Sequence, residues 1–182
     1  MSKTALILVD IQNDYFASGN WPVALMDKVA ENAAMLLARA RETGMTVIHI
    51  RHETAPGAPF FQPGSEGAEI HASVTPTADE TVLTKNRPNS FHQTGLLDLL
   101  RRDEIEALII CGAQSQMCVD ATTRAAVDYG FKVTLPFDAC GAKEATFGDI
   151  TVPPEMVQAA FMAPLAMSYA KVATTAEVLT QI

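Results

Sequence analysis

The sequence predicts an α/β fold: a three-layer, doubly wound and mainly parallel sheet of about six strands, with helices on both faces. Two observations carry this prediction. Several short segments, such as 5–9 and 107–111, are apolar without interruption, which is typical of strands buried on both faces. These segments alternate with stretches of helical period, and an alternation of strand and helix favours a parallel sheet that helices cover.

The first half of the chain contains three expected strands and two expected helices. The strands lie at 5–9, 46–50 and, more weakly, 80–84. A helix is expected at 23–43 because its apolar residues recur on one face, and Gly44 stands where a helix often ends. A second helix is expected at 96–102. The stretch 53–79 between the second and third strands holds four prolines and three glycines, so we expect a long loop that acts as a lid or a subunit contact.

The second half continues the alternation. Strands are expected at 107–111, 131–135 and 171–173, with a helix at 118–129 between the first two. Pro153 and Pro154 can open a further helix, because proline is tolerated in the first helical turn. Pro164 interrupts the pattern that follows, so we expect a kink or two shorter helices there. No repeat or linker divides the chain, and residues 1–182 are expected to form one domain.

Composition limits the possible partners. The chain of 182 residues has 13 basic and 21 acidic residues and a net charge of −8, which disfavours nucleic acid and anionic membranes as partners. No signal peptide or membrane-spanning run is recognisable in the sequence. Three cysteines are an odd and low number for a secreted disulfide framework, so we expect a cytoplasmic protein with reduced thiols.

Candidate catalytic residues follow three of the expected strands. Asp10, Lys85 and Cys118 come after the first, third and fourth strands, and the carboxyl ends of parallel strands meet at one edge of the sheet. Cys118 stands at the expected start of a helix, where the helix dipole and Lys85 would favour the thiolate and make alkylation rapid and insensitive to pH. The alternative is that Cys118 is a small buried apolar residue, Asp10 a helix cap and Lys85 a solvated strand end.

Four segments resemble the isochorismatase-like cysteine hydrolase superfamily, which includes nicotinamidases and N-carbamoylsarcosine amidases. They are Ala5-Leu-Ile-Leu-Val-Asp-Ile-Gln-Asn-Asp-Tyr-Phe16, Val47-Ile-His-Ile-Arg-His52, Lys85-Asn-Arg-Pro-Asn-Ser-Phe91 and the stretch that begins Gly112-Ala-Gln-Ser-Gln-Met-Cys118. The resemblance implies a catalytic triad of Asp10, Lys85 and Cys118. It also implies an oxyanion hole made by the backbone N–H groups of Gln114 and Cys118, and a cis peptide at Ala113–Gln114, although many relatives have threonine where this chain has Gln114.

The implied activity is cleavage of a C–N bond in a small amide, lactam or carbamoyl compound through an acyl-thioester on Cys118, with Asp10 as the general acid and base and Lys85 stabilising the thiolate. Vinyl-ether hydrolysis of the isochorismatase type is the alternative, and a metal-assisted nicotinamidase is a further one. A nucleotide-binding protein has little support, because no glycine-rich phosphate-binding motif follows any expected strand.

The resemblance also bears on cofactors, the pocket and assembly. Nicotinamidases hold a metal through an Asp-x-His pair and a later histidine, whereas this chain has Arg51-His52-Glu53, and His71 is the only candidate to join His52. We therefore expect no metal and no other cofactor. The substrate pocket is expected to include Phe16, Trp21, His52 and Phe91. The family is commonly oligomeric, so a homodimer or homotetramer is expected.

Overall fold

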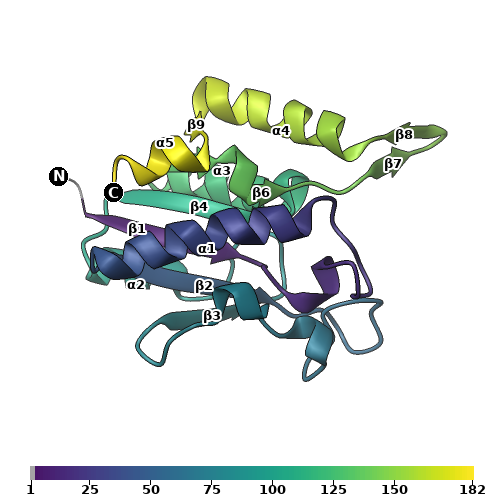
Figure 1. Cartoon of the computed structure of the whole chain (residues 1–182), viewed down its shortest axis with the longest axis horizontal. Coiled ribbons are helices and arrows are strands. Elements are labelled where there is room, and N and C mark those ends of the chain that lie inside the picture. Colours follow the sequence, from purple (N-terminus) through teal and green to yellow (C-terminus); the bar gives the residue numbers. More distant parts are fainter. Residues whose placement is uncertain (1–2) are drawn as a thin grey trace.

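The computed structural model describes residues 3–182, and its centre is a sheet of seven parallel strands. Six of them lie in the order β3-β2-β1-β4-β5-β9, and the short β6 pairs with the end of β4 (Figure 1). The strands are β1 (Thr4–Val9), β2 (Thr46–His52), β3 (Thr81–Lys85), β4 (Ala107–Ala113), β5 (Lys132–Pro136), β6 (Cys140–Gly141) and β9 (Ala170–Ala173). The predicted parallel α/β architecture is confirmed.

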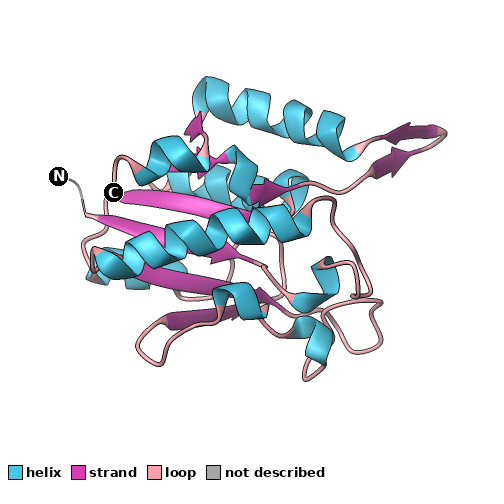
Figure 2. Cartoon of the chain, viewed as in Figure 1, coloured by secondary structure: helices cyan, strands magenta, loops and turns pink. Residues whose placement is uncertain are grey.

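Helices cover both faces of this sheet (Figure 2). They are α1 (Met26–Glu42), α2 (Leu96–Arg102), α3 (Asp120–Asp128), α4 (Pro154–Ser168) and α5 (Thr175–Leu179). One hydrophobic cluster packs α1 and α5 against one face, and a second cluster packs α2, α3 and α4 against the other. Successive side chains of a strand point to opposite faces, so Leu6 and Leu8 enter the first cluster and Ala5 and Ile7 the second.

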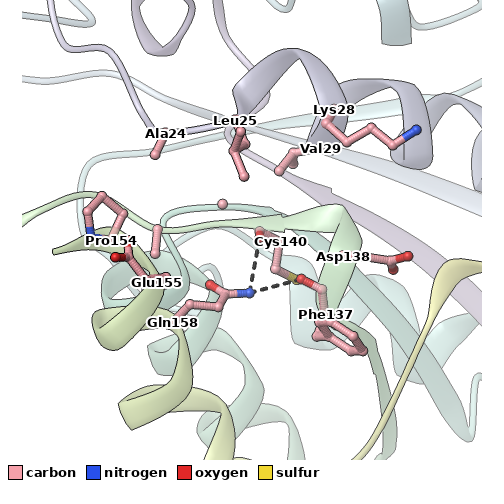
Figure 3. Close-up of a pocket in the computed structure, with 12 residues that line it drawn as sticks. Ala24, Leu25, Lys28, Val29, Phe137, Asp138, Cys140, Pro154, Glu155 and Gln158 are labelled. Carbon is pink, nitrogen blue, oxygen red and sulfur yellow. Dashed lines mark hydrogen bonds between the residues drawn. The ribbon is translucent and has the colours of Figure 1, made fainter.

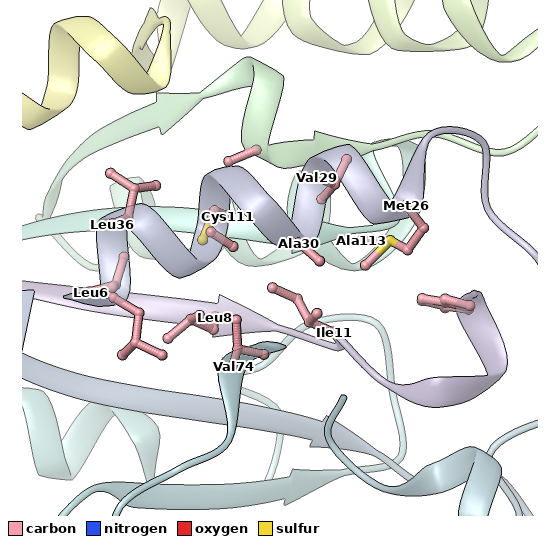
Figure 4. Packing of buried hydrophobic residues seen from close by; sticks show 14 of the residues in the cluster. Leu6, Leu8, Ile11, Met26, Val29, Ala30, Leu36, Val74, Cys111 and Ala113 are labelled. Carbon is pink, nitrogen blue, oxygen red and sulfur yellow. The ribbon is translucent and has the colours of Figure 1, made fainter. Parts of the chain in front are cut away.

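The apolar face of helix α1 packs against the sheet, as its amphipathic sequence pattern predicts. Its residues Val29, Ala30 and Leu36 belong to the same buried cluster as Leu6 and Leu8 of β1 (Figure 4). All five are at most 4% exposed. The helix ends at Glu42, and Gly44 has a positive φ of 68°, which is the left-handed conformation that commonly follows a helix.

Two features of the second half differ from the sequence-based expectation. Helix α4 runs without interruption from Pro154 to Ser168, so the expected division at Pro164 is wrong. Proline deprives the carbonyl four residues earlier of its partner, and that residue, Ala160, is exposed, so water can solvate its carbonyl. An antiparallel hairpin of β7 (Ala145–Phe147) and β8 (Ile150–Val152), which the sequence did not indicate, projects from the body (Figure 1).

The loop 53–79 is tied to the rest of the chain. It contains short 3-10 turns at Glu66–Ala68 and Ala72–Val74, and its Ile70 pairs with Gln12 in an isolated antiparallel bridge. The backbone N–H of Asn13 donates to Glu69, and that of His71 donates to Ile11. This loop therefore packs along the segment that follows β1. Among residues 3–182, no helix has both the length and the apolar character that a membrane span requires.

Candidate active site

Polar side chains at or after the ends of four adjacent strands lie together at one edge of the sheet. In sheet order, Lys85 ends β3, His52 ends β2, Asp10 follows β1, and Cys118 comes five residues after β4. His52 and Lys85 are paired in the parallel register of β2 and β3, so their side chains lie on the same face. The structure thus brings together the three predicted catalytic residues, and it adds His52 to them.

Lys85 is the centre of this group. Its Nζ lies 2.8 Å from Oδ2 of Asp10 and 3.1 Å from the sulfur of Cys118. It also lies 2.9 Å from Nδ1 of His52 and 3.2 Å from the carbonyl oxygen of Arg87. The side chains of Lys85 and Asp10 are both 0% exposed, so an ion pair stands in the protein interior. An ammonium has three N–H donors, and every atom around it can accept a hydrogen bond.

The pKa values of Lys85 and Cys118 are both raised, but for different physical reasons. Burial alone would lower the pKa of Lys85, but the neighbouring Asp10 carboxylate and Cys118 outweigh it and raise this pKa. Burial raises the pKa of the Cys118 thiol well above its usual range, and the Asp10 carboxylate raises it further, against the opposing effect of Lys85. Burial and Asp10 thus favour the neutral thiol of Cys118, and Lys85 favours the thiolate.

Asp10 combines an unusual backbone with a free acceptor atom. Its φ of 52° places it in the left-handed region, which aspartate tolerates better than most residues. No described residue donates a hydrogen bond to its buried Oδ1. The sulfur of Cys118 and a carboxylate oxygen of Asp10 lie within 4.8 Å of each other. An unsatisfied carboxylate oxygen beside a thiol is placed to accept that thiol's proton or a hydrogen bond from a bound molecule.

The turn between β4 and α3 carries Cys118. Residues Ser115–Val119 form one π-helical turn that runs directly into α3 at Asp120, so Cys118 lies in this turn, two residues before α3. The peptide bond Ala113–Gln114 is cis, as the family resemblance implies. Gly112 has a φ of 123°, and a Cβ at this position would lie 2.0 Å from the Val9 carbonyl oxygen. Only glycine therefore lets the end of β4 approach the end of β1 so closely.

The segment after Asp10 organises the surroundings of the site. The side chain of Gln12 is fully buried; its Oε1 accepts from the backbone N–H of His52 at 2.8 Å, and its Nε2 donates to the His52 carbonyl at 2.9 Å. Asp14 accepts from the backbone N–H of Phe61, and a Cβ at Gly67 would lie 2.3 Å from its carboxylate. These two side chains therefore hold the segment after Asp10 against the end of β2 and the loop 53–79.

The fit of a metal can be tested against these distances. Asp10, His52 and Cys118 offer a carboxylate, an imidazole and a thiol within 4.8 Å of one another. A zinc ion would need to approach such atoms to about 2.0–2.3 Å. The Lys85 ammonium already lies among all three, and its positive charge would repel the ion. The residues therefore do not fit a metal while Lys85 is in place. His71 does not join the group, because its Nδ1 is 2.9 Å from Oγ of Ser73 and its ring stacks on Phe16.

Two aromatic residues expected in the substrate pocket, Trp21 and Phe91, lie in different surroundings. Trp21 stacks on Phe60 at 4.9 Å between ring centroids. Phe91 is 8% exposed and packs in the second core cluster, with ring contacts to Tyr129 and Phe131. The sequence-based reasoning missed one residue of this region.

The missed residue is Tyr15, which is 3% exposed and packs against Phe61 at 4.6 Å. Burial raises the pKa of its phenol well above the usual value, and the Asp10 carboxylate adds to this shift. The Tyr15 phenol therefore lies near both Asp10 and Cys118. The signal that could have found it is its place in the Asp10–Phe16 motif, five residues after the catalytic aspartate.

An apolar hollow of about 540 Å³ lies elsewhere in the fold, between the start of α1, the 3-10 turn Phe137–Ala139 and the start of α4 (Figure 3). Leu25, Val29, Phe137 and Pro154 are among its lining residues, and Cys140 lies at its floor. Neither Asp10, Lys85 nor Cys118 lines it. This hollow is therefore separate from the group of reactive side chains.

Comparison with known proteins gives the family. The isochorismatase domain model matches residues 4–177. The isochorismatase family protein YddQ of Bacillus subtilis is 46% identical over 94% of this chain and 96% of its own length. A solved structure of an isochorismatase hydrolase from Oleispira antarctica is 44% identical, with a TM-score of 0.95 over 98% of this chain and 97% of that one.

Two relatives carry the names of hydrolytic activities. Streptothricin hydrolase of Streptomyces noursei is 40% identical over 84% of this chain, which spans about half (52%) of that relative. Maleamate amidohydrolase of Pseudomonas putida is 30% identical over 79% of this chain and 74% of its own length. The extent of the family match and these relatives establish that the chain belongs to the isochorismatase family and is a hydrolase.

Proposed function

We propose that the protein is a metal-independent cysteine amidohydrolase that cleaves a C–N bond in a small amide, lactam or carbamoyl compound. The observation that carries this proposal is the buried Lys85 ammonium, 2.8 Å from the Asp10 carboxylate and 3.1 Å from the Cys118 sulfur. A carboxylate beside a thiol is the arrangement that general-base activation of a nucleophile requires. The amidohydrolase among the relatives supports the same class of bond.

The first half-reaction begins from the Cys118 thiol. Asp10 accepts the Cys118 proton as the sulfur attacks the carbonyl carbon, so the thiolate need not accumulate beforehand. The negative charge that leaves the Asp10 carboxylate reappears on the substrate oxygen. We assign the stabilisation of that oxygen to the backbone N–H groups of Gln114 and Cys118. Asp10 then gives its proton to the leaving nitrogen, the C–N bond breaks, and an acyl-thioester remains on Cys118.

The second half-reaction uses the same groups. Water gives a proton to Asp10 while its oxygen attacks the thioester carbonyl, and collapse of the adduct releases the acid and a thiolate that recovers the proton from Asp10. Lys85 stays charged throughout, because its raised pKa holds its protons, and it stabilises the negative charge as it moves between Asp10 and Cys118. No external proton carrier is needed.

A panel of small amides, lactams and carbamoyl compounds, with ammonia or amine release as the readout, tests this proposal. Wild-type protein should hydrolyse at least one compound, and Cys118→Ala should reduce that rate to background. Rapid acid quenching followed by intact-mass measurement should detect an acyl adduct on the wild-type chain and none on Cys118→Ala. Full activity of Cys118→Ala would refute the thioester mechanism.

A further inference from the structure

His52 is the outermost member of the reactive group. Its side chain is 13% exposed, whereas those of Asp10 and Lys85 are 0% exposed. Its Nδ1 lies 4.0 Å from the sulfur of Cys118, so a molecule bound covalently to that sulfur would lie beside the imidazole. Besides the nucleophilic Cys118 sulfur, the imidazole is therefore the group around Lys85 that a substrate can meet directly.

The contact with Lys85 decides which ring nitrogen of His52 carries a proton. An ammonium can only donate hydrogen bonds, so Nδ1, at 2.9 Å from Lys85 Nζ, must offer its lone pair. A neutral imidazole with a bare Nδ1 carries its proton on Nε2. Burial, followed by the Lys85 charge, lowers the pKa of His52, and the Asp10 carboxylate only partly opposes this, so the ring is neutral near pH 7.

The backbone of His52 is held as firmly as its ring. The buried Gln12 side chain both accepts from the His52 N–H and donates to the His52 carbonyl, and Gln12 Nε2 also donates to the carbonyl of Ala68 at 2.7 Å. Gln12 stands two residues after Asp10, so the histidine and the carboxylate are fixed relative to each other. No described residue forms a hydrogen bond with Nε2 of His52, and this N–H is left for a ligand.

We propose that His52 is a further catalytic residue that contacts the substrate, donating a hydrogen bond from Nε2–H to an oxygen on the acyl part, and that the enzyme prefers amides with a second oxygen acceptor beside the scissile carbonyl. This inference rests on the proposed amidohydrolase function. His52 acts as a fixed donor and not as a proton carrier, since Lys85 keeps its protons. A substrate without such an acceptor would leave the Nε2–H unpaired when it covers the site, which is unfavourable.

The first test examines the resting protein and needs no substrate. Long-range ¹H–¹⁵N correlation spectra distinguish the two neutral tautomers of histidine, and a His52→Gln variant assigns the signal. At pH 7 we expect the Nε2–H form, and in Lys85→Met a mixture of tautomers, because the donor to Nδ1 is gone. A proton on Nδ1, or on both nitrogens, in the wild-type protein would overturn the proposal even if the enzyme hydrolyses amides.

The second test compares two amides of similar shape: malonamide, which carries a second carbonyl, and 3-methylbutanamide, which does not. We expect wild-type protein to favour malonamide in kcat/KM by about five- to tenfold beyond the twofold advantage of its two equivalent amides, the usual effect of one neutral hydrogen bond. His52→Leu should abolish this preference and His52→Gln, which retains an N–H donor, should keep part of it. Circular dichroism and thermal melting verify that each variant folds.

The exposed His92, outside the reactive group, gives a matched control, and His92→Gln should behave as wild type. A preference for malonamide that survives in His52→Leu would overturn the inference, as would hydrolysis of other amides with no preference between these two. If no amide is hydrolysed at all, the proposed function fails and the substrate preference fails with it. The tautomer measured in the resting protein separates that outcome from a failure of the His52 geometry.

Discussion

Removal of the Lys85 ammonium tests the physical basis of the site. The variant Lys85→Met keeps the length of the side chain but leaves the Asp10 carboxylate buried without its counter-ion. Both side chains are 0% exposed, and their charged atoms are 2.8 Å apart. Breaking a buried ion pair by removing one partner costs about 3–5 kcal/mol, because the remaining charge is uncompensated. We therefore expect the free energy of unfolding to fall by about that amount at pH 7.

The two partners should not be equivalent. In Asp10→Asn, the ammonium still has His52, Cys118 and the Arg87 carbonyl as acceptors within 3.2 Å. In Lys85→Met, the carboxylate accepts no hydrogen bond from any described residue. Lys85→Met should thus be the more damaging of the two substitutions. Its deficit should shrink in acid, where the isolated carboxylate can take up a proton.

Urea unfolding, followed by fluorescence and circular dichroism, measures these effects in a double-mutant cycle. The double variant Asp10→Asn/Lys85→Met should be more stable than the sum of the single effects predicts, by about 2 kcal/mol or more, because it buries no charge at this place. Single effects that add within about 0.5 kcal/mol would refute the reasoning. So would a loss smaller than about 1 kcal/mol in Lys85→Met.

Three further predictions concern positions around the site and on the surface. Gln12→Glu replaces the Nε2 donor of Gln12 by an acceptor that faces two carbonyl oxygens, so stability should fall and kcat of the folded protein should fall about tenfold or more; a wild-type kcat would contradict the positioning of His52. The Arg41 hydrogen bonds lower the pKa of Glu80 to about 2, so Glu80→Gln should cost about 1–2 kcal/mol at pH 7, a loss that disappears as the pH falls from 4.5 towards 2 in pH-dependent melting. Phe147 is 91% exposed at the tip of the projecting hairpin, and we propose that it contributes to a homodimer or homotetramer. Phe147→Ser should therefore lower the mass measured by light scattering, and an unchanged oligomeric mass would contradict this proposal.

Much of the fold could be predicted because it depends on local patterns. The uninterrupted apolar run before Asp10 and the helical period of 23–43 are set by burial, and burial repeats along the sequence with the period of each element. The hairpin 145–152 was missed because its strands are three residues long and their large apolar side chains are exposed. No alternation between a buried and an exposed face marks such strands.

The candidate site, like the fold, could be predicted in part from the sequence. Asp10, Lys85 and Cys118 could be named because each follows an expected strand and belongs to a family motif. The role of Gln12 and the central position of Lys85 could not, because they depend on contacts between segments far apart in the sequence, such as that of Lys85 with Asp10, 75 residues earlier. The raised pKa of the Cys118 thiol could not be predicted for a related reason: the helix start and Lys85 are visible in the sequence, whereas burial and the approach of Asp10 are not.

That raised pKa gives a last prediction. Because the pKa of the Cys118 thiol is raised, the rate of its alkylation by iodoacetamide should rise with pH throughout the range 6–9, in place of the flat profile of a preformed thiolate. Asp10→Asn removes a negative charge that contributes to the raised pKa, so this variant should be alkylated faster at each pH even though it loses hydrolytic activity.

Peptide mass spectrometry can follow Cys118 separately from Cys111, which is 0% exposed, has a thiol pKa raised by burial and serves as an internal control. A wild-type alkylation rate that is independent of pH would show that the thiolate is already formed. Asp10 would then have no thiol proton to accept, and its part in the mechanism would be limited to the leaving group and the water. A faster alkylation of Cys118 combined with a slower hydrolysis in Asp10→Asn, while Cys111 stays unreactive, is the result expected of a general base. A residue that merely supported the fold would, when replaced, expose the buried Cys111 to alkylation as well.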